Sequence, residues 1–313
     1  MTNPITCDVA VVGGGAAGLA AAVTLGRSLR SVVVVDSGEP RNAPAAGVHN
    51  LLAREGIAPQ DLLTAGRREA EQVGAELRRD RAVAARRAGD RIEVDLAGGG
   101  TLLARRLLLA TGLADELPDI PGVREHWGSD VLHCPYCHGW EVRGRRIGVL
   151  GTGPMSAHQA LLFRQLSEHV VLFAHRMPDP GEEVREQLDA LDVPIIDGTV
   201  RRLRAADGAL RAVVLDEQEV AVDAVAVAPR FVGRTDLYEQ LGGSRVEHPT
   251  GEFVETGALG RTEIAGVSVA GNAADLSAMV GAAAASGNTA AAGINADLVA
   301  EDARAAVHAR RNR

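Results

Sequence analysis

The sequence predicts an α/β protein with two Rossmann-like dinucleotide-binding domains, the second of which is inserted in the first. Two observations carry this prediction. A glycine-rich turn between an apolar strand and a helix occurs twice, at 13–18 and at 151–156. Strand and helix patterns also alternate along the chain, which is typical of parallel sheets covered on both faces. The length of 313 residues suits two domains better than one or three.

The first glycine-rich turn lies between the elements that a dinucleotide site requires. Apolar runs predict strands over 8–12 and 32–35, and an Ala- and Leu-rich run predicts a helix that ends near Arg27. The second strand ends at Asp36, where a carboxylate can accept a hydrogen bond from a ribose hydroxyl. Strand, turn, helix, strand and acid together make a strong signature for a nucleotide site.

Three glycines of this turn have distinct tasks. Gly13 permits the tight turn, Gly15 lets a pyrophosphate approach the backbone, and Gly18 allows the helix to pack close to the strand. The first N–H groups of a helix have no partner within the helix, so its N-terminus attracts the phosphate charge.

The second unit has the same order but lacks two of these features. The expected elements are a strand over 146–150, a helix over 157–166 and a strand over 170–173. Ser156 replaces the third glycine, and Ala174 stands where the first unit has Asp36. The missing acid disfavours an NAD site, and Arg176 alone is weak support for a 2′-phosphate. We therefore expect this unit to bind a nicotinamide nucleotide poorly or not at all.

Proline and glycine signals mark the limits of the two domains. A strand over 107–110 runs into Thr111-Gly112, and a proline-marked exit follows. Near the C-terminus, a strand over 267–270 ends at Gly271-Asn272, and an Ala-rich helix is expected from about Ala273. The predicted first domain comprises 1–114 and 244–313, and the inserted domain comprises 115–243.

Composition and charge argue against several classes of function. The net charge is −8 and all 33 basic residues are Arg, so no basic face for nucleic acid is expected. No stretch approaches twenty uninterrupted apolar residues, so we expect no membrane span. The N-terminus lacks a charged leader with an apolar run, which favours a cytoplasmic protein. Three cysteines are too few for a disulfide framework, and Cys7 is expected to be a small core residue.

The hexapeptide His-Cys-Pro-Tyr-Cys-His at 133–138 lies between the two glycine-rich turns. Two cysteines separated by two residues can come within disulfide range without moving the backbone. Pro135 suits the first position of a helical turn, and a helix start lowers the pKa of a thiol and so favours the thiolate. An adjacent His can take a proton from an incoming thiol near neutral pH. Between two dinucleotide-binding units, such a pair points to a flavin that acts on sulfur.

Other interpretations of this motif stay open. The string Cys-x-x-Cys-His also marks haem attachment, which would require export. A zinc site would have to bring together the adjacent residues His133, Cys134, Cys137 and His138. A glutaredoxin-like pair and an inert buried pair are the remaining possibilities.

Two further groups of residues have simpler expected roles. The aromatic residues near the motif are expected to pack in the core rather than to line a pocket; they are Trp127, Tyr136 and Trp140. The arginine pairs are expected on solvated faces; they lie at 67–68, 78–79, 86–87 and 201–202.

The order of these motifs resembles that of thioredoxin-reductase-like flavoproteins over nearly the whole chain. The matching motifs are Gly13–Gly18, Ala110-Thr111-Gly112, Cys134-x-x-Cys137 before Gly151-x-Gly153, and Ala270-Gly271-Asn272. Three positions depart from thioredoxin reductases, because His138 and Asn272 each replace an Asp and His175-Arg176-Met177 keeps only the beginning of the NADPH signature. The segment Cys-Pro-Tyr-Cys-His-Gly-Trp-Glu at 134–141 resembles the gliotoxin-, holomycin- and romidepsin-type dithiol oxidases.

In that group, FAD accepts electrons from a natural-product dithiol and passes them to O2, which closes a disulfide and gives H2O2 without NADPH. The resemblance implies an FAD-binding first domain, a small-molecule dithiol substrate and a homodimer. It also implies that Cys137 is the flavin-proximal sulfur and that Cys134 exchanges with the substrate. His138, with His133 as second candidate, would be the acid/base. The residues implied for FAD are Gly13, Gly15, Gly18, Asp36, Asn50, Thr111, Gly112, Asn272, Met279, Val280 and Gly281.

Two other functions remain to be weighed against dithiol oxidation. An NADPH-dependent disulfide reductase of the thioredoxin-reductase type is disfavoured by the segment 174–181, which is poor in arginine where a 2′-phosphate would bind. A non-catalytic flavin-binding redox sensor or partner-binding module would not produce peroxide steadily from a small dithiol in air.

Overall fold

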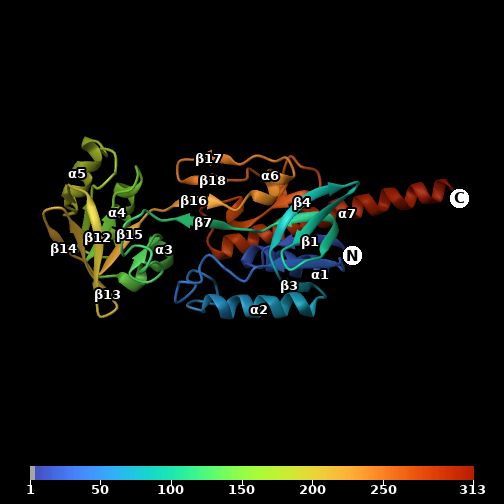
Figure 1. Ribbon diagram of the computed structural model, residues 1–313, viewed down its shortest axis with the longest axis horizontal. Helices are drawn as coiled ribbons and strands as arrows, with labels where there is room; N and C mark the ends of the chain where they lie inside the picture. Colours follow the sequence, from blue (N-terminus) through green and yellow to red (C-terminus); the bar gives the residue numbers. More distant parts are fainter. Residues whose placement is uncertain (1–3) are drawn as a thin grey trace. The chain divides into compact units, whose positions relative to one another are not determined.

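The computed structural model describes residues 4–313 and divides into two compact units (Figure 1). The first unit contains the described residues up to Ala43, Pro59–Ala114 and Phe231–Arg313, and the second contains Pro44–Ala58 and Asp115–Arg230. These limits differ at two places from the predicted domains, 1–114 with 244–313 and 115–243. Residues 44–58 belong to the second unit, and residues 231–243 belong to the first.

Residues 44–58 form a closed loop that is tied to the second unit. Val48 and Ile57 make an antiparallel bridge, in which the N–H of Val48 donates to the carbonyl of Ile57 at 2.8 Å. The side-chain amide of Asn50 donates to the carbonyl of Tyr136, far along the chain. A bond between such distant residues leaves no local pattern in the sequence, so the sequence gives no sign that this loop packs with the second unit.

Residues 231–243 are held by the core of the first unit. They include the short helix α6 (Asp236–Gln240), whose Leu237 and Tyr238 are buried with the first sheet. The side-chain carbonyl of Gln240 also accepts a hydrogen bond from the N–H of Ala85 at 2.9 Å.

The first unit is built on a seven-stranded sheet in the order β3-β2-β1-β6-β5-β4, with β19 paired to β6. Its strands are β1 (Ile5–Val12), β2 (Val32–Asp36), β3 (Glu76–Arg79), β4 (Ala82–Ala88), β5 (Arg91–Leu96), β6 (Thr101–Leu109) and β19 (Val267–Val269). The segment β3-β2-β1-β6 and the strand β19 are parallel, whereas β5 and β4 continue the sheet in antiparallel pairing. The carboxyl ends of β2, β1, β6 and β19 therefore lie at one edge, where nucleotide sites form in such sheets.

Helices cover one face of this sheet. On the other face, residues of its own antiparallel strands and of α6 form a second core. The helices α1 (Ala16–Arg27), α2 (Pro59–Gln72) and α7 (Val280–Arg311) pack on the face that carries Val9 and Val11. On the opposite face, Ala10 of β1 shares its core with Ile92 of β5 and with α6. Cys7 lies in this second core, as predicted, and burial raises the pKa of its thiol to about 12.

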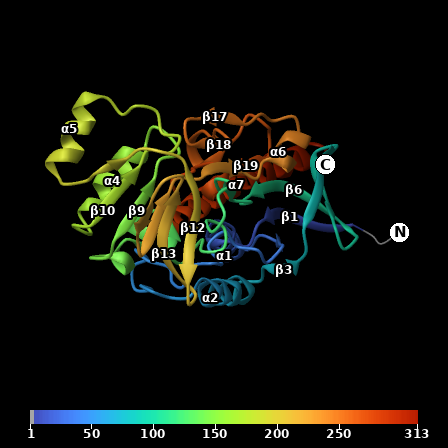
Figure 2. The same cartoon turned by 60° about the vertical axis from the view of Figure 1, so that its left-hand side comes forward.

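The second unit has a five-stranded parallel sheet in the order β11-β10-β9-β15-β8. Its strands are β8 (Val131–Leu132), β9 (Ile147–Leu150), β10 (Val170–Phe173), β11 (Ile195–Ile196) and β15 (Ala224–Val227). The helices α4 (Ser156–Arg164) and α5 (Glu182–Ala190) pack on one face. An antiparallel sheet of β12 (Val200–Ala206), β13 (Ala209–Leu215) and β14 (Glu219–Ala221) packs on the other, as Figure 2 shows for β12 and β13.

The remaining strands form a small sheet in the order β17-β18-β16-β7. They are β7 (Leu113–Glu116), β16 (Arg230–Gly233), β17 (Val246–His248) and β18 (Gly251–Phe253). Within residues 4–313, no helix is both long enough and apolar enough to cross a membrane.

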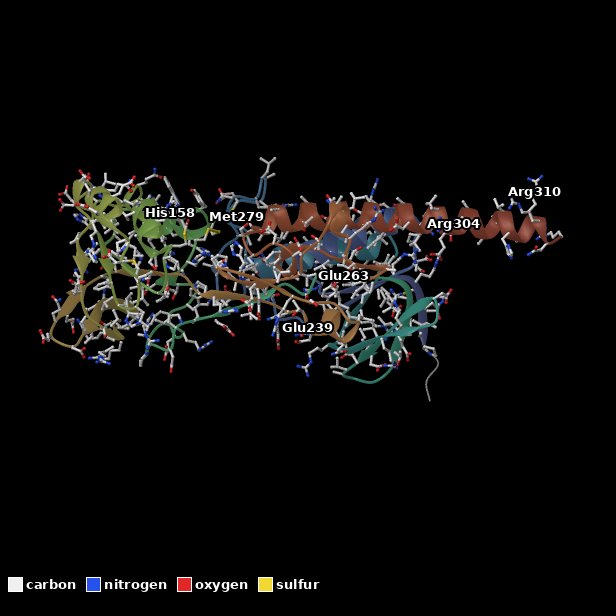
Figure 3. All side chains as sticks on the ribbon, turned by 90° about the horizontal axis from the view of Figure 1, so that it is seen from above. His158, Glu239, Glu263, Met279, Arg304 and Arg310 are labelled. Atoms are coloured by element: carbon white, nitrogen blue, oxygen red, sulfur yellow. A yellow bond between two sulfur atoms is a disulfide. The ribbon has the colours of Figure 1, made fainter. Side chains whose placement is uncertain are left out.

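The helix α7 begins at Val280. The sequence predicts a start near Ala273, and this prediction is wrong. Residues Gly271–Ala273 form a short 3-10 helix, and the Asn272 side-chain amide donates to the carbonyls of Asp275 and Ala278, each at 2.9 Å. These bonds hold the segment 272–278 in turns and delay the start of the helix. From Met279 the helix then runs past Arg304 to Arg310 (Figure 3).

Gly287 lies where α7 packs against α1, and a Cβ at this position would overlap the backbone carbonyl of Ala17. Because both backbones are helical, no side-chain rotation relieves the overlap. We expect Gly287→Ala to lower the free energy of unfolding by about 1–3 kcal/mol, measured by urea denaturation. The matched control is Ala282→Ser on the exposed side of α7, which should change it by about 0.5 kcal/mol or less. An unchanged midpoint for Gly287→Ala would contradict this close crossing.

Candidate functional site

Cys134 and Cys137 form a disulfide at the start of the short helix α3 (Pro135–His138), with their Cα atoms 5.2 Å apart. Cys134 has an extended backbone and caps the helix, since its sulfur accepts a hydrogen bond from the N–H of Cys137 at 3.1 Å. Pro135 fills the first helical position, where a backbone N–H would have no partner in the helix. Because the two sulfurs are bonded to each other, neither is the free thiolate that a zinc site requires.

His138 ends the same helical turn, and its ring lies near the ring of His49 from the loop 44–58. The ring centroids are 6.0 Å apart and the ring planes are nearly perpendicular, at 87°. Burial is the main cause that lowers the pKa of His138; the charge of His49 lowers it further, and Glu141 acts in the opposite direction. An imidazole that stays neutral at neutral pH can accept a proton from a thiol.

Two carboxylates face the two ring nitrogens of His49. Its Nδ1 is 2.6 Å from a carboxylate oxygen of Glu55, and its Nε2 is 3.6 Å from one of Glu141. The other oxygen of Glu55 accepts a hydrogen bond from the N–H of Asn50 at 2.9 Å. The hydrogen bond with His49 is the largest cause that lowers the pKa of Glu55.

Nitrogen and oxygen atoms of His49, His138 and Glu141 lie within 4.8 Å of one another. No motif in the sequence predicts a role for His49, Glu55 or Glu141. The available signals were weak: His49 precedes Asn50, and Glu141 closes the eight-residue segment that carries the resemblance.

His133 lies outside this group. Its Nδ1 is 3.0 Å from the carbonyl oxygen of Val227 at the end of β15, and its own carbonyl accepts from the side-chain amide of Gln159 at 2.7 Å. These bonds fix His133 to the sheet and to α4, so the structure brings only one of the two predicted histidines to His49 and Glu141.

Two of the three aromatic residues near the disulfide are exposed, contrary to the prediction. Tyr136 and Trp140 keep 65% and 66% of their surface in contact with solvent, and the guanidinium of Arg143 stacks on Trp140 at 3.9 Å. Trp127 is partly buried against the core of the second unit, as predicted. The error arises because α3 and the segment that follows it lie at the surface, where aromatic rings have no core to enter.

The three glycines of the first turn differ in what surrounds them. Gly13 has φ of +106°, and a Cβ there would overlap the carbonyl of Ala110; a Cβ at Gly18 would overlap the carbonyl of Gly13. In the described part of the chain, a Cβ at Gly15 would meet no atom within 4 Å. Among the same residues, no side chain caps α1, which begins at Ala16. Open space before free helix N–H groups fits the pyrophosphate of a dinucleotide.

Asp36 ends β2 beside this turn. One carboxylate oxygen accepts from the N–H of Gly14 at 3.1 Å, and the other lies 3.3 Å from the guanidinium of Arg67. Arg67 was expected on a solvated face, so its pairing with Asp36 is a correction. The pair follows from the fold, because α2 carries Arg67 to the end of β2.

The other residues implied for FAD in the first unit follow the ends of β6 and β19. The hydroxyl of Thr111 donates to the carbonyl of Arg234 at 2.7 Å, and Gly112 has φ of +71°. The side-chain oxygen of Asn272 accepts from the guanidinium of Arg41 at 3.4 Å, while its side-chain amide nitrogen donates to carbonyls of the turn before α7. Within residues 4–313, no side chain caps α7, whose first residues are the predicted Val280 and Gly281, after Met279 at the cap. The starts of α1 and α7 therefore share one sheet edge with the ends of β1, β2, β6 and β19.

Asn50 is the one residue implied for FAD that lies in the second unit. It has φ of +58°, and its side chain is engaged with the carbonyl of Tyr136.

The second glycine-rich turn is filled by its own side chain. The hydroxyl of Ser156, which is fully buried, accepts from the N–H of Thr152 at 3.1 Å and from the N–H of Gly153 at 3.2 Å. These are N–H groups of the turn that cradles phosphate in a dinucleotide-binding unit.

The segment after β10 folds back on this turn. The N–H of Arg176 donates to the carbonyl of Gly151 at 3.0 Å, and a Cβ at Gly151 would fall 2.9 Å from the Cβ of Met177. The ring of His175 accepts from the N–H of Val200 at 3.1 Å, and burial, Arg176 and Arg201 together lower its pKa. The segment after Ala174, which stands where the first unit has Asp36, is thus held by bonds within the second unit.

A family model described as pyridine nucleotide-disulphide oxidoreductase matches residues 7–291 of this chain. The thioredoxin reductase tcpT of Claviceps purpurea is 30% identical over 286 residues, which cover 87% of this chain and 88% of that protein.

Two solved structures are similar over nearly the whole length. HlmI matches with a TM-score of 0.93 and 46% identity, covering 99% of both chains. An oxidoreductase from Agrobacterium tumefaciens matches with a TM-score of 0.89 and 32% identity, covering 94% of this chain and 99% of the other. The predicted thioredoxin-reductase-like α/β fold is confirmed by these likenesses.

The space at Gly15 leads to a prediction that separates binding from folding. We expect Gly15→Ala to keep the thermal stability of the protein without FAD, because its methyl group meets no protein atom. The same methyl group should weaken FAD retention by roughly tenfold or more, since it stands where a pyrophosphate meets the backbone. Absorbance near 450 nm after gel filtration measures the retained flavin.

Gly18→Ala is the comparison variant, and it should lower the stability of the FAD-free protein because its Cβ overlaps the carbonyl of Gly13. Full FAD retention by Gly15→Ala would show that the dinucleotide binds elsewhere.

Proposed function

We propose, from the premise that the chain belongs to the pyridine nucleotide-disulphide oxidoreductase family, that it oxidises a small-molecule dithiol to an intramolecular disulfide. The family implies FAD as cofactor and thiol/disulfide oxidoreduction as the class of reaction. The observation that carries the proposal is the Cys134–Cys137 disulfide on one helical turn with His138, an imidazole whose pKa is lowered. The 46% identity to HlmI over 99% of both chains supports it.

In the proposed reaction, a substrate thiol gives its proton to a ring nitrogen of His138. The resulting thiolate attacks Sγ of Cys134, the bond between the two cysteine sulfurs breaks, and Cys137 leaves as a thiolate. The second thiol of the substrate then attacks the substrate sulfur of the mixed disulfide, which releases the cyclic disulfide and frees Cys134. Because both thiols are on one molecule, this second step has an effective molarity that can reach roughly 10⁵ M or more.

When bound, FAD would supply the two-electron oxidation that restores the Cys134–Cys137 disulfide, and O2 would take up the electrons with H2O2 as product. The residues that would hold it in the first unit are Gly13, Gly15, Gly18, Asp36, Thr111, Gly112, Asn272 and Met279–Gly281. The uncapped starts of α1 and α7 and the open space at Gly15 support this assignment. We propose that O2 is the acceptor and that the protein works as a homodimer.

We propose further that NADPH is not the electron donor. The hydroxyl of Ser156 already accepts the N–H groups of the second turn, and Arg176 is bonded through its backbone to Gly151. A nicotinamide nucleotide would have to displace these internal bonds without an acidic partner for its ribose. The rival function, an NADPH-dependent disulfide reductase, is supported by the name of tcpT.

The two functions predict opposite results in a stopped-flow experiment without oxygen. We expect dithiothreitol, as a probe dithiol, to bleach the flavin band of the holoenzyme, and NADPH to leave it unchanged over the same time. In air, one H2O2 should form for each dithiol oxidised. Bleaching by NADPH at a catalytic rate would establish the reductase instead. Cys134→Ser is the control, which should lose reduction by dithiol while keeping its FAD.

His138 is expected to set the acid limb of the pH profile. Its pKa is lowered, so the neutral ring and the rate of flavin reduction should persist below the ordinary histidine range and fall only as pH drops through the lowered pKa. His138→Gln should reduce this rate by about 10²-fold and abolish the limb. His158→Gln, at the surface of α4 (Figure 3), is the matched control. If His133→Gln abolished the limb and His138→Gln did not, the base would be assigned to the wrong histidine.

A further inference from the structure

We infer that His49 is a positioning residue for the proposed reaction: clamped between the carboxylates of Glu55 and Glu141, it places a positive charge beside His138 and fixes that ring as the base for the substrate thiol. This inference rests on the proposed function. It names a residue 85 positions before Cys134, on a loop that the sequence assigned to the other domain.

Two carboxylates surround the ring of His49. Both ring nitrogens face carboxylate oxygens, at 2.6 Å for Nδ1 to Glu55 and 3.6 Å for Nε2 to Glu141. The Nδ1 contact is a hydrogen bond, whereas the Nε2 contact is an ion-pair distance beyond hydrogen-bonding range. Two negative carboxylates within 4 Å of a ring favour its protonated form by Coulomb attraction, and we infer on this ground that His49 carries the charge.

The loop 44–58 holds the charge of His49 at a fixed place. Glu55 accepts from both the ring of His49 and the N–H of Asn50, and the side chain of Asn50 donates to the carbonyl of Tyr136 between the two cysteines. The bridge between Val48 and Ile57 closes the loop around this arrangement. The carboxylate–histidine pair is thus attached to the same helical turn that carries the disulfide.

The rings of His49 and His138 lie near each other. Their centroids are 6.0 Å apart and their planes are nearly perpendicular, so a proton on His138 would face a neighbouring cation. In the described part of the chain, the charges that act on the pKa of His138 are those of His49 from the loop and Glu141 from the 3-10 helix Trp140–Val142. Helix α4 also reaches α3, but there Leu166, just beyond its end, makes an apolar contact at Gly139. Burial is the main cause that lowers the pKa of His138, and a cation at this distance lowers it further.

Two substitutions distinguish the effect of the His49 charge from the effect of its hydrogen bond to Glu55. His49→Asn keeps a donor near the position of Nδ1 and so keeps the bond to Glu55, but it removes the charge. His49→Arg keeps a cation. The probe reaction is the reduction of the holoenzyme flavin by dithiothreitol without oxygen, followed from about pH 5 to pH 9.

We expect the acid limb of His49→Asn to move to higher pH, with little change near pH 8 and a loss of rate that approaches roughly tenfold for each unit of pKa shift at pH values below the limb of the parent protein. His49→Arg should keep the limb of the parent protein, and His158→Gln, the same kind of change on α4, should leave the profile untouched. A loss of rate at every pH in His49→Asn, with the limb unmoved, would reduce His49 to a structural residue. Equal profiles for the Asn and Arg variants would also overturn the inference, because charge would then have no effect.

A second measurement does not depend on dithiol oxidation. The titration of the His138 ring, followed by NMR of histidine-labelled holoenzyme, should move toward the ordinary histidine value in His49→Asn and stay low in His49→Arg. If the titration moves while dithiothreitol fails to reduce the flavin, the proposed function fails and the electrostatic coupling stands. If the titration does not move, the inference fails whatever the enzyme does. Stoichiometric metal in the purified protein, with a profile altered by EDTA, would show that a cation other than a proton fills this space and would overturn the inference.

Discussion

One helical turn carries both sulfurs of the disulfide and the proposed base, His138. The N–H of His138 donates to the carbonyl of Cys134 at 3.1 Å, and the N–H of Cys137 donates to the sulfur of Cys134. A helix of four residues has little stability of its own, so tertiary contacts must hold it. Gly139 permits them, since a Cβ there would overlap the carbonyl of Pro135 and the side chain of Leu166. The positions of the disulfide and of the imidazole are therefore set by the same few backbone bonds, and neither can shift without the other.

The two glycine-rich turns show how one residue changes the use of a shared backbone pattern. At Gly18 the missing side chain lets α1 pack on the turn, and the space before Gly15 stays open. At the corresponding position of the second turn, the buried Ser156 hydroxyl accepts two N–H groups that a phosphate would otherwise bind. A phosphate that bound to these N–H groups would have to displace the Ser156 hydroxyl, which would then be a buried polar group without its hydrogen bonds. The second unit thus keeps the architecture of a nucleotide-binding domain, with a side-chain hydroxyl bonded to two N–H groups of its glycine-rich turn.

The sequence was informative where structure is local. Strand periodicity and glycine spacing located β1, α1, β2 and β10 to within a few residues, and the disulfide geometry follows from the spacing of Cys134 and Cys137. The sequence was not informative where a contact between residues distant in the chain determines the local structure. The loop 44–58 joins the second unit through bonds such as that of Asn50 to Tyr136, and α7 starts late because Asn272 binds carbonyls ahead of it. The pairing of Arg67 with Asp36 has the same origin, since it depends on how α2 returns along β2.

The loop 44–58 also shows why the Cys-Pro-Tyr-Cys-His segment is an incomplete description of the site. The pKa of a histidine next to the second cysteine depends on its surroundings. At His138, burial and the charge of His49 lower the pKa, and Glu141 acts in the opposite direction. His49 can act only because Glu55, six positions later, turns back through the Val48–Ile57 bridge to meet it. A related chain with the same cysteine segment but without the His and Glu of this loop would have the same disulfide and a base that is protonated at higher pH. The chemistry of the motif therefore depends on two segments that only the folded chain brings together.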